Sequence, residues 1–176
     1  MEEDIRIFKE KENTPENNSI KDEYSRENER GNILKGKTLG TKIAEMLLDR
    51  YDEFSPTLSD ENSEMALQKG ILLCFSATIA MEENCDASVV LQVAKNSFNE
   101  KLKDKKIELY EAIQGGSEFS FYYLAYRRGT EIDRRIGQTF AMLCSHDGDP
   151  VYQELGEAVY CWFLSKVSKI VQAEGL

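Results

Sequence analysis

The chain has 176 residues, of which 41% are hydrophobic, enough for one domain with an ordinary hydrophobic core. Its 32 Asp and Glu outnumber 22 Lys and Arg, which gives a formal net charge of −10. Because an acidic protein repels nucleic-acid phosphates and anionic lipid, we expect neither nucleic acid nor a membrane as partner.

The N-terminal segment has a different composition from the rest of the chain. Residues 1–36 contain 10 acidic and 7 basic side chains and few apolar ones. Such a segment cannot bury enough apolar surface to offset the entropy lost on ordering. We therefore predict a disordered, mobile charged tail over 1–36, followed by a single helical domain over 37–176. Its one apolar cluster, Ile5, Ile7 and Phe8, is either incidental or a docking motif.

Residues 31–38 read GNILKGKT and match the pattern G-x-x-x-x-G-K-[ST]. Over these eight residues the chain resembles a P-loop nucleotide-binding protein. The resemblance implies phosphate contacts from Gly31, Gly36, Lys37 and Thr38. The pattern normally follows a buried parallel strand, whereas residues 19–30 contain no apolar run. We therefore expect a flexible lead-in to the first helix and keep phosphate binding as an alternative.

Apolar periodicity predicts five helices and no strand. The expected helices cover about 38–54, 57–81, 87–113, 118–144 and 150–170. The second opens on a capping-box-like Thr57-x-x-Asp60, and the third loses register near Asp104. The last begins at Pro150 behind Asp149 as N-cap. Short connections favour antiparallel neighbours.

Residues 118–144 carry apolar side chains over most of the circumference of a helix. A helix of this kind packs on several sides, so we predict that it is the central helix of the bundle. Gly129 leaves open whether it is continuous, kinked or broken. Ile136 of this helix and Trp162 of the last one are expected in the core. The predicted fold is an all-α, five-helix, mostly antiparallel bundle around 118–144.

Asp133 falls on the same predicted face as Tyr122 and Tyr126, one turn from Gly137. A carboxylate on an apolar face is either paired or has a raised pKa. It could anchor a ligand in an aromatic pocket where Gly137 leaves space. The alternative that we favour is a structural acid tied to a tyrosine or an arginine.

Four arginines, including Arg127 and Arg134, lie within residues 127–135. Guanidinium groups bind phosphate or carboxylate with two parallel hydrogen bonds, so this cluster is a candidate site for an acidic ligand. It could instead neutralise the acidic molecule itself or contact another copy in an oligomer.

The four cysteines are widely spaced, without a C-x-x-C pair, and are typical of reduced thiols in a cytoplasmic protein. The turn containing Cys144, His146, Asp147 and Asp149 offers too few ligands for zinc or calcium. We expect neither a metal nor another cofactor.

The sequence contains no convincing set of catalytic residues, and this favours a non-catalytic helical interaction or regulatory module. Its expected partner is another protein or a second copy of the chain. Two alternatives remain: a nucleotide-binding enzyme using residues 31–38, and a helical small-molecule binder with a pocket near Tyr126 and Asp133.

Overall fold

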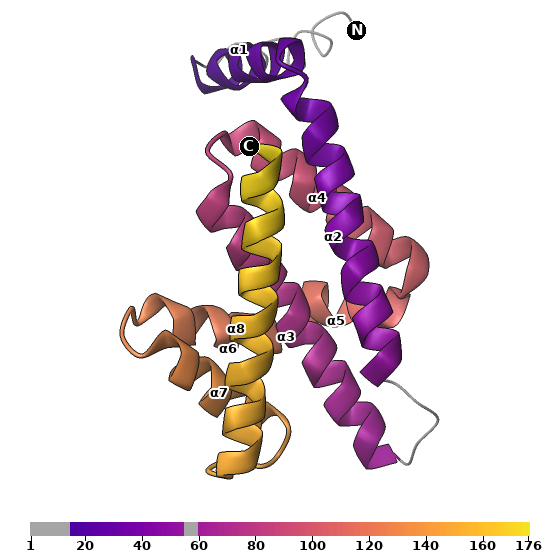
Figure 1. Ribbon diagram of the computed structural model, residues 1–176, viewed down its shortest axis with the longest axis vertical. Helices are drawn as coiled ribbons and strands as arrows, with labels where there is room; N and C mark the ends of the chain where they lie inside the picture. Colours follow the sequence, from indigo (N-terminus) through magenta and orange to yellow (C-terminus); the bar gives the residue numbers. More distant parts are fainter. Residues whose placement is uncertain (1–14, 55–59) are drawn as a thin grey trace, which may run out of the picture.

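The computed structural model describes residues 15–54 and 60–176, and within these ranges the chain forms eight α-helices and no strand (Figure 1). The all-α prediction is confirmed, whereas the number of helices exceeds the five expected. The helices are α1 (Pro15–Glu29), α2 (Asn32–Phe54), α3 (Asp60–Asn84), α4 (Ser88–Lys105), α5 (Ile107–Gly115), α6 (Glu118–Arg127), α7 (Ile132–Leu143) and α8 (Pro150–Glu174).

The central helix is α3, not the segment 118–144. Every residue from Gly70 to Met81 is buried, and α3 packs against α8 and, less extensively, against α2 and α4–α7. The stretch Glu64–Asn84 is long and apolar enough to cross a membrane, but 78% of its most apolar window is buried within the bundle. Its composition therefore reflects a core position in this fold.

Segment 118–144 is broken at Gly129 into two helices, α6 and α7. Gly129 has φ 72° and Glu131 has φ 49°, both in the left-handed region that ends a right-handed helix. The chain reverses there, and α7 runs back along α6 as a hairpin beside α8 (Figure 1). The sequence left the continuity of this segment open at Gly129, and the structure shows two helices rather than one central helix.

The expected third helix is also divided, close to the point where its apolar register fails. Lys106 has φ −145° and ψ 73°, outside helical values, and separates α4 from α5. Two shorter helices in place of one let Val90, Ala94 and Phe98 face α2 while Leu109 packs near Gly70.

Two helix pairs are in unusually close contact because glycines remove side chains at the crossing. A Cβ on Gly40 of α2 would overlap the carbonyl oxygen of Ala94 in α4. In the second pair, a Cβ on Gly137 of α7 would overlap the carbonyl oxygen of Gln153 in α8. The absence of a side chain at both positions allows backbone-to-backbone packing.

The sequence predicted a disordered tail over 1–36, but residues 15–36, the part of this segment that the structure describes, are largely helical. They form α1 and the start of α2. Glu27, 8% exposed, accepts hydrogen bonds from Arg30 at 3.1 Å and Asn32 at 2.6 Å, which joins α1 to α2. Composition misses this because here charged side chains make specific contacts near helix ends rather than remaining solvated. Ile5, Ile7 and Phe8 lie outside the described residues.

Helix α8 begins as predicted, with Asp149 accepting a hydrogen bond from the Val151 backbone N–H at 2.9 Å. Its inner face carries Val159, Phe163 and Val167, all buried. Trp162 is 41% exposed, so the prediction that it lies in the core is wrong. Val151, also predicted to face inward, is 69% exposed. The predicted apolar stripe is too wide because a helix on the outside of a bundle buries only part of its circumference.

Candidate functional site

The residues that match the P-loop pattern lie in helical structure rather than in a loop. Gly31 has φ 76° and separates α1 from α2, and residues 32–38 are the first two turns of α2. From Gly36 onward the backbone N–H groups make hydrogen bonds within the helix and cannot converge on a phosphate. Thr38 Oγ1 donates to the Leu34 carbonyl at 3.0 Å, and Lys37 is exposed.

Gly36 has a packing role instead. A Cβ at this position would lie 3.1 Å from both a side-chain carbon and the carbonyl oxygen of Val90 in α4. Gly36 and Gly40 are therefore one turn apart at the α2–α4 crossing. The second glycine of G-x-x-x-x-G-K-T is therefore explained by close packing of α2 on α4, which the pattern alone does not reveal.

Tyr122 belongs to the aromatic core rather than to a ligand pocket. Its side chain is fully buried and stacks on Phe75 of α3 with ring centroids 5.4 Å apart. Burial raises its pKa well above the ordinary value. Its hydroxyl has no hydrogen-bond partner among the described residues. Phe75 also contacts Phe119, Tyr123, Tyr126 and Tyr160.

Tyr126 and Asp133, predicted to share a face, have separate partners. The Tyr126 hydroxyl donates to Glu83 Oε1 of α3 at 2.6 Å, and this bond, with burial, raises the pKa of Tyr126 to about 12. Asp133 is exposed on α7. The pKa of the Cys161 thiol in α8 is raised to about 11. Burial is the largest cause, followed by the negative charge of Asp133 and a hydrogen bond to Asp133. Helix α8 fills the space expected beside Gly137.

The arginines gather at the turn of the α6–α7 hairpin. Arg127 and Arg134 are exposed, and Arg134 lies 3.5 Å from Glu131. The sequence spacing of Arg127, Glu131 and Arg135 would form a ladder of charge pairs on one continuous helix, but the break at Gly129 ends that helical spacing. Instead, Arg135 Nε donates to the carbonyl oxygen of Thr130 at 2.8 Å.

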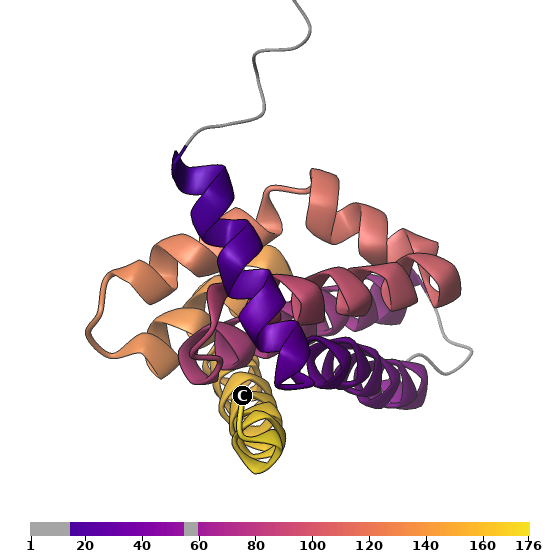
Figure 2. The same ribbon diagram turned by 90° about the horizontal axis from the view of Figure 1, so that it is seen from above.

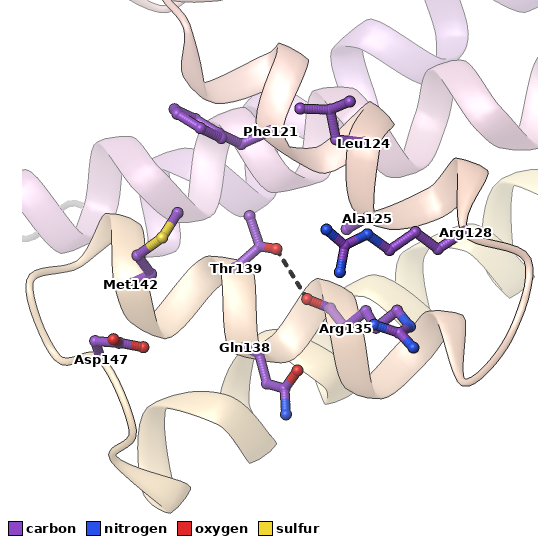
Figure 3. Close-up of a pocket in the computed structure, with 9 residues that line it drawn as sticks. All are labelled: Phe121, Leu124, Ala125, Arg128, Arg135, Gln138, Thr139, Met142 and Asp147. Carbon is purple, nitrogen blue, oxygen red and sulfur yellow. Dashed lines mark hydrogen bonds between the residues drawn. The ribbon is translucent and has the colours of Figure 1, made fainter.

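A groove of about 360 Å³ runs along the outer side of the α6–α7 hairpin (Figure 3). We call it the α6–α7 groove. It is lined by Phe121, Leu124, Ala125, Arg128, Arg135, Gln138, Thr139, Met142 and Asp147. Three of its apolar side chains remain accessible to solvent: Phe121 at 42%, Leu124 at 61% and Met142 at 42%.

The two ends of the α6–α7 groove differ in chemistry. Because α6 and α7 run in opposite directions, Phe121 lies across from Met142 at one end and Arg128 lies near Arg135 at the other (Figure 3). Asp147, from the turn after α7, is beside Met142. Residues 127–135 hold four arginines and two acids, a local charge of +2 within a chain of −10. The groove thus combines an apolar end with a basic end.

The sequence does not reveal Phe121, Leu124 and Met142 as surface residues. A continuous helix over 118–144 would place Phe121 on an apolar stripe, whereas α6 buries Tyr122 and Ala125 and leaves Phe121 42% exposed. The signal that could have identified them is Gly129 within the run RRGTE, where glycine is flanked by polar residues as at a turn.

Two further results bear on function. Among the described residues, no group of three or more His, Cys, Asp or Glu is placed to hold a metal ion. His146 stacks on Tyr152, with ring centroids 3.8 Å apart.

No protein-family model, no curated protein and no solved structure matches the chain. Its function is therefore inferred from geometry alone.

Proposed function

We propose that the protein is a non-catalytic interaction module that binds a helical segment of another protein in the α6–α7 groove. The observation that carries the proposal is the exposure of Phe121, Leu124 and Met142 around one groove. Large apolar side chains grouped at a concave surface are typical of protein-binding sites. Two antiparallel helices form a trough of the kind that receives a third helix.

The charges of the groove define the partner further. Arg128 and Arg135 form a basic end, which complements carboxylates on the bound segment. Arg128, the C-cap residue of α6, follows Phe121 by seven residues, or about 10 Å along the helix axis. The matching partner is an amphipathic helix with an apolar anchor and an acidic residue about two turns away.

The alternatives have less support. An enclosed small-molecule site buries most of its ligand, whereas Leu124 at 61% exposure marks an open trough. For the nucleotide-binding alternative, the helical conformation of residues 32–38 gives no convergent donors. The four free thiols fit a reducing compartment, so we propose a cytoplasmic protein with neither a membrane nor nucleic acid as partner.

Selection from a displayed library of amphipathic helical peptides tests the proposal and requires no identified partner. We expect enrichment of peptides with an apolar anchor and an acid about two turns apart. Leu124→Asp should abolish their binding because it places a charge among apolar contacts. Leu34→Asp is the matched control, since Leu34 is 70% exposed on α2 outside the groove. Selected peptides that bind both variants equally would refute the assignment.

A further inference from the structure

Helix α8 has an outer side that no other described helix covers. In Figure 2 the yellow helix lies at the periphery of the bundle, and α3, α7 and, less extensively, α2 pack against it. Exposed residues recur on it at intervals of three or four, as on one face of a helix. We call this the α8 outer face; it comprises Val151, Glu154, Ala158, Trp162, Ser165 and Lys169. None of them lines the α6–α7 groove.

Trp162 is the large aromatic residue of the α8 outer face. Its ring is 41% exposed and lies near two cations, with Arg50 Cζ at 5.6 Å and Lys166 Nζ at 5.3 Å from the ring centroid. These cation–π contacts hold the indole in a defined position at the surface. A tryptophan held in this way loses little side-chain entropy on association, and tryptophan is enriched among residues that dominate interface energies.

The charges on the α8 outer face are separated along the helix. Glu154 lies eight residues before Trp162, and Lys169 lies seven residues after it. If two copies of α8 lie antiparallel with their Trp162 residues near the centre, each Glu154 comes opposite Lys169 of the other copy. The neighbours of the tryptophan on this face, Ala158 and Ser165, are small and leave space for an opposing indole. Such a face is complementary to itself under two-fold rotation.

We propose that the α8 outer face binds a second copy of this chain, with the two α8 helices antiparallel about a two-fold axis near Trp162. Charge complementarity selects this occupant. Along α8 the face carries an acidic residue, then the tryptophan, then a basic residue, so in an antiparallel pair the acid of each copy lies opposite the base of the other. One helix per subunit makes a small interface, so the dimer forms reversibly and depends on concentration. This association is independent of the α6–α7 groove.

Sedimentation velocity on the full chain, at concentrations up to about 1 mM, tests this association. We expect the wild type to dimerise and Trp162→Ala to weaken dimerisation at least about tenfold. Glu154→Lys and Lys169→Glu should each weaken it as well, because each single variant places like charges opposite each other. Circular dichroism must show wild-type helix content for each variant.

An equimolar mixture of the two charge variants gives the decisive result. A Glu154→Lys chain carries Lys at both positions and a Lys169→Glu chain carries Glu at both, so their antiparallel pair has opposite charges at both facing positions. The mixture should therefore associate more tightly than either single variant alone, and a mixture that does not would overturn the proposal. The double variant Glu154→Lys/Lys169→Glu restores opposite charges at both positions and should form a homodimer. A wild type that stays monomeric at all concentrations, a dimer that the single variants retain, or a double variant that fails to associate would each overturn the proposal.

Discussion

The carboxylate of Glu23 in α1 caps the N-terminus of α4, 65 residues further along the chain. Ser88 Oγ donates to its two oxygens at 3.0 and 3.1 Å, and the Val89 backbone N–H donates at 3.3 Å. The N-cap residue Ala87 has no side chain that could accept these bonds. A negative charge also interacts favourably with the positive end of a helix dipole. A segment rich in charge thus contributes a specific tertiary contact.

Glu23→Ala should lower the free energy of unfolding by about 1 kcal/mol, as expected for losing a helix cap. It should also speed amide exchange in α1, because this contact fixes α1 on α4. Chemical denaturation and hydrogen exchange measure the two effects. Glu29→Ala is the control, since Glu29 is exposed on the same helix. An equal loss in both variants would show that the cap contributes nothing.

Gly40→Ala should destabilise the fold by about 1–3 kcal/mol, despite the higher helix propensity of alanine. The added methyl group meets the backbone of Ala94 and Phe98 in α4, which cannot move aside as a side chain can. Gly115→Ala is the matched control, because a Cβ there meets no atom within 4 Å. Urea denaturation compares the two. A Gly40→Ala protein as stable as wild type would contradict the close α2–α4 crossing.

Ile136 and Trp162 should respond differently to truncation, although the sequence predicted both in the core. Ile136 is fully buried, so Ile136→Ala should lower the free energy of unfolding by about 2–5 kcal/mol. Trp162 is 41% exposed, so we expect a smaller loss for Trp162→Ala than for Ile136→Ala. Thermal and chemical denaturation of the two variants, measured side by side, settle the order. A larger loss at Trp162 would contradict the orientation of α8.

Cys161 should react slowly with iodoacetamide around neutral pH. Burial first, and then Asp133, raise its pKa to about 11, and the thiolate is the reactive form. Asp133→Asn removes the negative charge, so the rate at Cys161 should increase at a given pH. Mass spectrometry of labelled peptides resolves Cys161 from Cys74, which is fully buried. An unchanged rate in Asp133→Asn would show that the carboxylate does not act on this thiol.

The raised pKa of Cys161 also determines whether the protein becomes more or less stable as the pH rises into the alkaline range. A raised pKa means that the folded state holds the thiol proton more tightly than the unfolded state. The stabilising contribution is therefore complete below the ordinary thiol pKa and is lost as the pH rises through about 11. Tyr126, with its pKa raised to about 12, acts in the same direction. The thermal midpoint should fall on the alkaline side, and Asp133→Asn should reduce that fall.

Nucleotide binding should be weaker than about millimolar, with or without Mg²⁺. Phosphate binding at residues 31–38 would require α2 to unwind at its N-terminus and give up helix hydrogen bonds along with the contacts of Gly36. Lys37→Ala should leave the stability unchanged, because Lys37 is exposed. Micromolar binding of ATP or GTP in calorimetry, abolished by Lys37→Ala, would contradict this account.

The sequence predicted the helical class and several helix ends because those depend on local signals. Asp149 and Pro150 mark the start of α8, and the loss of register near Asp104 anticipates the break at Lys106. It did not predict which helix is central. Both 70–81 and 118–144 are apolar on several sides, and the effect of Gly129 decides between them.

The candidate site could be predicted less well than the fold. The grouping of Tyr122, Tyr126 and Asp133 assumes one continuous helix, and the hairpin places Asp133 on a different helix from the two tyrosines. The α6–α7 groove depends on how α7 folds back on α6, a tertiary relationship without a local signal. The same holds for Glu23 and Ser88, since their hydrogen bond joins residues distant in sequence.

Binding of an amphipathic helix in the α6–α7 groove is tested most directly by methyl NMR of the methionines during titration with a selected peptide. Met142 lines the groove, whereas Met46 lies on α2 and Met81 in the core of α3. We predict that the Met142 methyl signal shifts with peptide concentration while those of Met46 and Met81 do not, and that Leu124→Asp removes the shift. A peptide that binds without moving Met142, or that moves it equally in Leu124→Asp, would contradict the account.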